Sequence, residues 1–383
     1  CNTRQPFPQV LCDHTGRHES RQLRMYDSKH SKKNFKTQED HDVRPVRNLW
    51  RSLSAFQFAD AGMFGTNACV ASGRQWLTEV SSTSQGMASI LFLVIFLLLP
   101  STLVAVEKLD FVAQPGGFQI PERIRLGACS AGGVDRMGNI YLLHRGRSPV
   151  ICLDKNGKFL RAWGDDTIKG PHGLRVDRHD HIWITDVGQH VVRQFTALGE
   201  PLLLLGQPGS AGDGPDQFNK PTDVAFSASG EIYVSDGYEN SRIKAFAVDG
   251  RLLRTWGEPG DCRGQLKIPH SILVDARERI LVGDSGNRRI QVFDRTGNVL
   301  EIWNGITALG MAYDPKGNLF VADGPGNKIL QLNEHGQIVG SWGGEGTDPG
   351  QFQVPHMLAT DGDGNLIVAE VKGFRFQKLV RRQ

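Results

Sequence analysis

The chain lacks the composition that marks several protein classes. Its 383 residues carry 44 Lys and Arg against 41 Asp and Glu, too even a balance for a nucleic-acid-binding field. Six cysteines are too few for a disulfide scaffold, and no apolar run reaches the ~20 residues of a membrane-spanning helix. Glycine is abundant instead, at 45 residues. Many glycines without low complexity indicate tight turns between short strands, which argues against a helical bundle.

The first 105 residues differ in composition from the rest. Residues 1–86 hold 12 Lys and Arg against 8 Asp and Glu, whereas the remainder is close to neutral. Met87 opens a segment whose apolar run, 90–99, has the length of the hydrophobic region of a signal peptide, although no basic residue lies between Met87 and Ile90. We therefore predict secretion or export to the periplasm. We expect residues 1–86 to be poorly ordered or spurious and residues 87–105 to be a signal peptide or N-terminal anchor. Residues 106–383 would form the mature domain.

Three cysteines lie in the expected mature domain, Cys129, Cys152 and Cys262. An odd number allows at most one bridge among them, and their irregular spacing offers no cysteine-based metal site. We expect these residues to have structural roles.

One phrase recurs six times after residue 126. Each copy reads as a strand, an Asp/Gly turn, a second strand, a polar turn and then two further strands. One reference position returns every 39 to 50 residues, at Val134, Val176, Phe226, Val274, Tyr313 and Thr360. Four short strands in about 40–50 residues are typical of a propeller blade. We predict an all-β, six-bladed β-propeller in which 109–113 supplies the last strand and closes the ring.

The second strand of each copy ends in a polar residue. These residues are His144, Asp186, Asp236, Asp284, Asp323 and Glu370. For most of the carboxylates, namely Asp186, Asp284, Asp323 and Glu370, we favour a structural role in binding turn amides.

Three histidines share a single position of the repeat. Four residues before the reference position, the six copies carry Ser130, His172, Thr222, His270, Leu309 and His356. The histidines fall in alternate copies and each follows a proline, at the expected start of an innermost strand. Their side chains are thus predicted to converge on the axis, where three imidazoles would suit Zn²⁺ and leave one coordination position open. The alternative is that each histidine only lines the channel.

Two more residues are expected near this position. Arg145 and Tyr238 follow second strands in the first and third copies. A tyrosine beside a metal cation can act as a base, and an arginine can clamp a carboxylate. The alternatives are cross-blade packing for Tyr238 and a surface ion pair for Arg145.

The repeated Asp, Asn-Arg-Ile or Asn-Lys-Ile, and Trp-Gly pattern resembles NHL repeats. With the three Pro-His motifs, the phrases Pro171-His-Gly-Leu and Asp236-Gly-Tyr-Glu-Asn-Ser-Arg resemble the lyase domain of peptidylglycine α-amidating monooxygenase, over about 110–383. The resemblance implies a zinc lyase that splits peptidyl-α-hydroxyglycine into a peptide amide and glyoxylate. It also implies residue roles. His172, His270 and His356 would be the zinc ligands, and Tyr238 would be the base. Arg145 would bind the substrate carboxylate or hold Tyr238 as phenolate.

The sequence departs from the family pattern at several positions. Ser285 stands where the family has a second arginine, with Arg288 and Arg289 nearby. Met357 replaces an aspartate that supplies part of a structural calcium site in the family, whereas the backbone positions Gly132 and Leu174 of that site remain, so the resemblance leaves Ca²⁺ open. The monooxygenase half is absent from these residues. We therefore expect a stand-alone lyase that takes a small peptide or another hydroxylated amide, supplied by a separate monooxygenase.

Two other functions fit the repeats. One is a non-catalytic NHL propeller that binds a protein or ligand on one face. The other is a different metal-dependent propeller hydrolase, such as a lactonase, although lactonases use carboxylate-rich axial sites. A near-neutral propeller argues against nucleic acid as a partner, and a closed ring is sufficient as a monomer.

Overall fold

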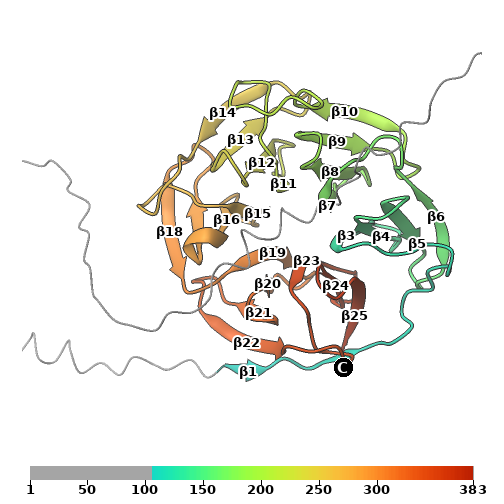
Figure 1. Cartoon of the computed structure of the whole chain (residues 1–383). Coiled ribbons are helices and arrows are strands. Elements are labelled where there is room, and N and C mark those ends of the chain that lie inside the picture. Colours follow the sequence, from blue (N-terminus) through green and yellow to red (C-terminus); the bar gives the residue numbers. More distant parts are fainter. Residues whose placement is uncertain (1–105, 383) are drawn as a thin grey trace, which may run out of the picture. The chain divides into compact units, whose positions relative to one another are not determined.

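Six sheets, antiparallel except at one edge, surround a central axis in the computed structural model, which describes residues 106–382 (Figure 1). The prediction of an all-β six-bladed propeller is confirmed. The predicted segments 1–86 and 87–105 lie outside the described residues. Within the described range, no helix has the length and hydropathy needed to cross a bilayer.

Each blade is built on three or four strands that are consecutive in sequence and neighbours in space. Blades one to three comprise β3 (Cys129–Val134), β4 (Ile140–His144), β5 (Val150–Leu153) and β6 (Phe159–Trp163); β7 (Pro171–Val176), β8 (Ile182–Asp186), β9 (Val191–Phe195) and β10 (Pro201–Leu205); and β11 (Asp223–Phe226), β12 (Ile232–Asp236), β13 (Arg242–Phe246) and β14 (Leu252–Trp256). Blades four to six comprise β15 (Pro269–Val274), β16 (Ile280–Asp284), β17 (Arg289–Phe293) and β18 (Val299–Asn304); β19 (Ala308–Tyr313), β20 (Leu319–Asp323), β21 (Lys328–Leu332) and β22 (Ile338–Gly343); and β23 (Pro355–Thr360), β24 (Leu366–Glu370) and β25 (Arg375–Arg381). A short 3₁₀ turn, η1 (Ser285–Asn287), follows β16. The innermost strands are β3, β7, β11, β15, β19 and β23.

The N-terminal strands close the ring. β2 (Phe111–Ala113) pairs antiparallel with β25 and completes blade six, as predicted. β1 (Glu107–Lys108) pairs parallel with β22 at the outer edge of blade five, which the repeat pattern did not predict. The first described residues therefore tie two blades together and cover strand edges that would otherwise be open to pairing with other chains.

Most carboxylates at the ends of the second strands hold turns and loops together. Asp186 accepts backbone N–H bonds from Lys169, Gly170, Gly188 and Gln189 at 2.8–2.9 Å. In blades three, four and six the carboxylate pairs with the arginine that starts the third strand: Asp236 with Arg242, Asp284 with Arg289, and Glu370 with Arg375. The predicted structural role is confirmed for Asp186, Asp284 and Glu370, and Asp236 has the same role.

Blades one and five depart from this scheme. In blade one, Nδ1 of the buried His144 takes the place of the carboxylate and accepts the N–H groups of Gly127 and Gly146 at 3.1 Å. In blade five, Asp323 accepts one bond, from the N–H of Gly326 at 3.2 Å, and partial burial raises its pKa. A hydrogen-bond acceptor therefore ends the second strand in these two blades as well, although its chemical group differs between an imidazole and a carboxylate.

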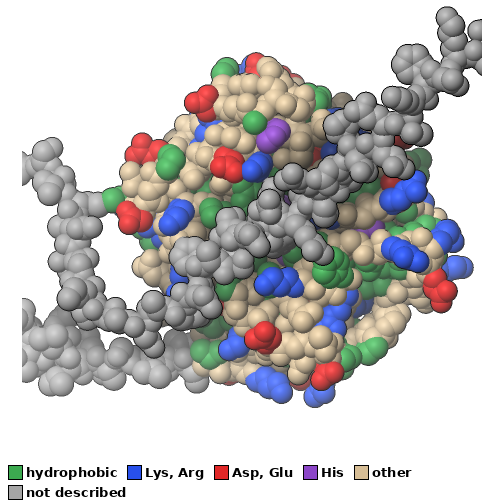
Figure 2. All heavy atoms as spheres, viewed as in Figure 1, with side chains coloured by type: hydrophobic (Ala, Val, Ile, Leu, Met, Phe, Trp, Pro, Cys, Tyr) green, Lys and Arg blue, Asp and Glu red, His purple; other side chains and the backbone are tan. Residues whose placement is uncertain are grey.

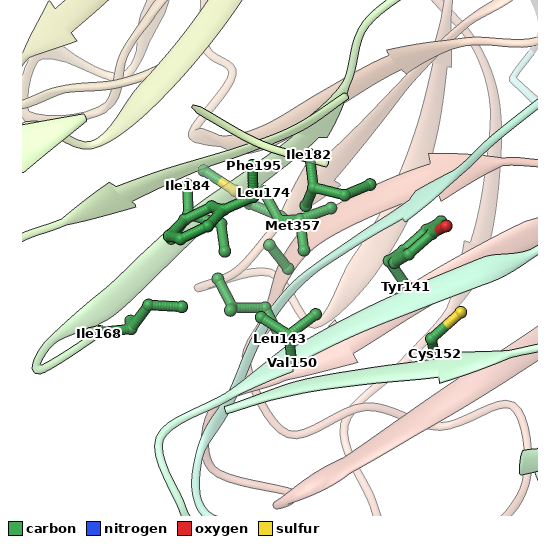
Figure 3. Packing of buried hydrophobic residues seen from close by; sticks show 11 residues of the cluster. Tyr141, Leu143, Val150, Cys152, Ile168, Leu174, Ile182, Ile184, Phe195 and Met357 are labelled. Atoms are coloured by element: carbon green, nitrogen blue, oxygen red, sulfur yellow. The ribbon is translucent and has the colours of Figure 1, made fainter. Parts of the chain in front are cut away.

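Apolar side chains fill the space between adjacent blades. Between blades one and two, Leu143 and Val150 pack against Ile184 and Phe195 (Figure 3). The thiol of Cys152 belongs to the same cluster and is free, as is the buried thiol of Cys129. Burial raises the pKa of both thiols, which keeps them protonated and unreactive, in agreement with a structural role.

Ring closure can be tested at Phe111. Its side chain is 5% exposed and its ring lies edge-on to Phe320, with 5.8 Å between centroids. Replacing Phe111 by Ala should lower the free energy of unfolding by about 3–5 kcal/mol, measured by urea denaturation, because a large buried ring is removed. The neighbouring Val112→Thr, at an exposed position of the same strand, should change it by less than about 0.5 kcal/mol. Equal stability of Phe111→Ala and wild type would contradict closure by β2.

Candidate metal centre

Three imidazoles meet on the axis of the propeller. His172, His270 and His356 are the second residues of β7, β15 and β23, which belong to alternate blades. Their ring centroids are 4.8, 4.8 and 4.7 Å apart, and their potential ligand atoms lie within 4.8 Å of one another. All three side chains are buried. The predicted convergence is therefore present, and the cluster could hold a metal ion.

A bulge re-aims each of these histidines. The pairing of β7 with β8 shifts register between Pro171 and Gly173, and the pairing of β15 with β16 shifts between Pro269 and Ser271. A similar shift spans the histidine of β23. Bulges are frequent beside functional sites because the extra residue leaves the alternation of the strand and can point along a new direction.

The hydrogen bonds of the triad fix its tautomers. Nδ1 of His172 lies 2.7 Å from the carbonyl oxygen of Thr222, Nδ1 of His270 lies 2.7 Å from that of Leu309, and Nδ1 of His356 lies 2.6 Å from that of Ser130. A carbonyl oxygen can only accept, so each Nδ1 carries the proton and each Nε2 has a free lone pair. Metal-binding histidines in proteins usually have this arrangement.

Burial keeps these imidazoles neutral. Loss of solvent lowers the pKa of all three, and lowers that of His270 to about 4. The pKa values of His172 and His356 are lowered further by the neighbouring imidazoles and by Arg145. Neutral imidazole nitrogens suit zinc, copper, nickel or iron better than magnesium or calcium.

Tyr238 lies directly against the triad. Its Oη is 2.9 Å from Nε2 of His172 and 3.2 Å from Nε2 of His270. The preceding Gly237 allows this approach, since a Cβ there would lie 1.9 Å from the carbonyl oxygen of Pro269. Burial raises the pKa of the phenol, whereas the charge of Arg145 lowers it.

The charge of Arg145 acts on this group. Arg145 donates through Nε to the carbonyl oxygen of Pro171 at 3.3 Å, and burial lowers its pKa. Among residues 106–382 it forms no ion pair with a carboxylate. The structure thus brings Arg145 and Tyr238 to the triad, and the guanidinium has donors left for an anion.

The two arginines near Ser285 have other surroundings. Arg289 bonds to Asp284 at 2.7 Å and to the carbonyl oxygen of Asp261 at 2.7 Å, so it is a structural clamp of blade four. The charge of Arg288 acts on Asp323 rather than on the triad. Ser285 itself donates to the carbonyl oxygen of Ile268. Within the described residues, neither arginine contacts the histidines.

An ion pair forms a floor beneath the triad, and sequence reasoning missed it. Arg175 contacts the fully buried Asp223 through Nε at 2.9 Å and Nη2 at 2.6 Å, and Nη1 donates to the carbonyl oxygen of Met311 at 3.0 Å. Asp223 also accepts the N–H of Ile272. The pair therefore joins blades two, three, four and five. A cavity of about 260 Å³ at this end of the channel is lined by residues of all six innermost strands, including Arg175.

The aspartate position of the implied calcium site carries no side-chain oxygen. Met357 is 1% exposed and packs in the same apolar cluster as Leu174 (Figure 3). A thioether in an apolar core does not suit a hard cation such as Ca²⁺. The side chain of Met357 therefore supplies no ligand for calcium.

Comparisons with known proteins agree with the repeats. The sequence profile of the NHL repeat matches residues 218–246. NHL repeat-containing protein 3 of Homo sapiens is 34% identical over 270 residues, which cover 63% of this chain and 76% of that protein. The chain belongs to the NHL repeat family. The mouse protein of the same name is 37% identical over 223 residues, covering 54% of the chain and 63% of that protein.

A second relative of this NHL protein is named for an enzymatic activity. Peptidyl-alpha-hydroxyglycine alpha-amidating lyase 1 of Drosophila melanogaster is 31% identical over 317 residues, covering 68% of the chain and 58% of that protein. The chain thus spans less than two thirds of this lyase and of the mouse relative. Among solved structures, a streptogramin B lyase has a TM-score of 0.53 at 17% identity, covering 71% of this chain and 98% of that one. At this identity the likeness shows the propeller fold.

Charges of both signs are interspersed on the face of the NHL propeller that Figure 2 shows. Elsewhere on the propeller, opposite charges also pair, as in the exposed pair of Arg136 with Asp180 at 2.9 Å and the half-buried pair of Arg254 with Glu231 at 3.0 Å. Mixed charges of this kind produce no single-sign field on that face.

The floor of the site can be tested at Asp223. Replacing Asp223 by Asn leaves the guanidinium of Arg175 buried without a counterion, so the free energy of unfolding should fall by about 3–5 kcal/mol. Urea denaturation of the metal-free protein would measure this. The exposed pair Arg136–Asp180 supplies the matched control, because Asp180→Asn should cost about 1 kcal/mol or less. Similar losses in both variants would contradict a floor that joins four blades.

Proposed function

We propose that this NHL propeller is a zinc-dependent lyase that cleaves the C–N bond of peptidyl-α-hydroxyglycine-type substrates. The products would be an amide and glyoxylate. One observation carries the proposal: three buried imidazoles, each bonded through Nδ1 to a carbonyl oxygen, hold potential metal-ligand atoms within 4.8 Å of one another beside a tyrosine and an arginine. The relationship to an amidating lyase at 31% identity supports it.

Each group has a role in the proposed reaction. Zinc, held by His172, His270 and His356, would supply Lewis acidity toward a hydroxyl group. Arg145 would bind the substrate carboxylate, for which a planar guanidinium is well matched. Tyr238 would take the proton of the α-hydroxyl as a general base, and the charge of Arg145 favours the phenolate. A C=O bond then forms as the C–N bond breaks, its electron pair goes to nitrogen, and the nitrogen gains a proton.

The substrate and setting are further parts of the proposal. With Ser285 in place of a second arginine, carboxylate binding depends on Arg145, which favours a small peptide or another hydroxylated amide as substrate. A separate monooxygenase would supply it. We propose that the protein acts as a secreted or periplasmic monomer.

A second candidate function is a non-catalytic NHL propeller that binds a protein or ligand. The identities of 34% and 37% to NHL repeat-containing protein 3, higher than that to the fly lyase, favour it. In that case the triad would line the channel without chemistry.

Metal content separates these two functions. Elemental analysis of the purified, zinc-supplied protein should give about one zinc per wild-type chain, and none in His172→Ala/His270→Ala, because three imidazole ligands make a complete protein site. His335→Ala is the matched control and should retain zinc, since His335 is 71% exposed and lies in the turn between β21 and β22. No zinc in the wild type would rule out the lyase.

Activity tests the chemistry itself. The zinc-loaded protein should release glyoxylate from a peptidyl-α-hydroxyglycine, and Tyr238→Phe should lower kcat by about 10²–10⁴-fold because the general base is removed. Tyr313→Phe, a half-buried tyrosine in the cavity at the opposite end of the channel, should keep full activity. If the zinc-bound wild type released no glyoxylate, the metal centre would still be supported but the proposed reaction would be contradicted.

A further inference from the structure

His144 makes a hydrogen bond that carboxylates make in four other blades. In blades two, three, four and six, the carboxylate at the end of the second strand accepts an N–H group from the connection that precedes its blade. The donors are Lys169, Asn219, Lys267 and Gln353. In blade one the donor is Gly127 and the acceptor is Nδ1 of His144. The imidazole therefore takes over a bond of the repeat without bringing a negative charge to it.

The imidazole of His144 is neutral. Nδ1 accepts the N–H groups of Gly127 and Gly146, so its lone pair is used there and the ring proton lies on Nε2. The side chain is fully buried, and burial lowers its pKa. Within residues 106–382, Nε2 has no hydrogen-bond partner. A carboxylate would leave no buried donor unpaired, so hydrogen bonding alone does not favour an imidazole here.

The two glycines that bond to His144 enclose the backbone of Arg145. A Cβ at Gly127 would lie 2.5 Å from the carbonyl carbon of Arg145, and the N–H of Arg145 donates to the carbonyl oxygen of Ala128 at 2.9 Å. Gly146 follows Arg145 directly and donates to the same Nδ1. The imidazole thus fixes the chain on both sides of the residue whose charge acts on the triad.

A carboxylate at position 144 would lack the partners that it has elsewhere. In blades three, four and six it pairs with the arginine that starts the third strand, whereas the third strand of blade one starts with Val150. Blade two has no such arginine, but Asp186 accepts four N–H groups, against two at position 144. A buried and poorly compensated charge there would act on the adjacent Arg145.

We propose that His144 is a positioning residue that holds Arg145 in place without neutralising its charge, so that the guanidinium stays available to the carboxylate of a ligand. The inference rests on the carboxylate-binding role of Arg145 in the proposed function. It adds a residue outside the metal-binding cluster whose lack of charge determines the affinity for the anion.

Two variants of equal shape separate position from charge. His144→Asn and His144→Asp each offer a side-chain oxygen to the N–H groups of Gly127 and Gly146, but only aspartate is negative. Calorimetric titration of the zinc-supplied protein with sodium glyoxylate, the carboxylate product of the proposed reaction, measures the affinity. His144→Asp should bind glyoxylate roughly five- to tenfold more weakly than His144→Asn, because the added charge competes with the ligand for Arg145. His144→Asn should bind it as wild type does.

Controls keep the comparison independent of folding. Zinc content and urea denaturation of each variant show whether the propeller and its metal centre are intact. Should His144→Asp fail to fold, His144→Gln and His144→Glu form a second pair of the same design, since blade six carries Glu370 at this position. Arg145→Ala should weaken glyoxylate binding by itself, and adding His144→Asp to it should cause no further loss.

The outcomes distinguish this inference from the proposed function. Equal affinities of the aspartate and asparagine variants would overturn the role of His144 while leaving lyase activity of the wild type unaffected. Absence of glyoxylate binding by the wild type would also overturn it. If the wild type bound zinc and glyoxylate but cleaved no peptidyl-α-hydroxyglycine, the proposed reaction would be contradicted, and a weaker affinity of His144→Asp would still support the inference.

Discussion

The hydrogen bond from each triad imidazole to a carbonyl group of the next blade is the contact on which the site depends. Nδ1 of His172, His270 and His356 bonds to the carbonyl oxygens of Thr222, Leu309 and Ser130. Donors and acceptors occupy the same position of the repeat in neighbouring blades. The ring must therefore close correctly for three lone pairs to meet, and β2, which completes blade six, supports the blade that carries His356.

The polar groups on the two sides of the triad differ in whether they can still bind a ligand. On one side, Tyr238 and Arg145 offer an oxygen and a cation to a ligand. On the other, the pair of Arg175 and Asp223 crosses the channel and satisfies its own charges. Because the pair joins four blades and carries no free ligand atom toward the histidines, chemistry is expected at the tyrosine side. The buried carboxylates of the blades serve the scaffold, which leaves imidazoles as the reactive groups of the axis.

The sequence predicted those features that the repeat itself encodes. Six blades, closure near residue 111 and the convergence of three histidines all follow from one register of strands and turns. The floor formed by Arg175 and Asp223 could not be read in this way, because which side chains meet across the channel depends on the curvature of the ring. The same holds for the bulges at the histidines, the parallel pairing of β1 and the clamp made by Arg289. Two unusual charges in otherwise apolar inner strands were the available signal for the floor.

X-ray absorption spectroscopy at the zinc edge tests the central claim most directly, because it reports the atoms around the metal. For the zinc-loaded protein we predict three imidazole nitrogens at ~2.0–2.1 Å, with the outer-ring scattering of histidine and one further light atom. A shell of oxygen or sulfur atoms without histidine scattering would contradict a metal centre on the axis of this propeller.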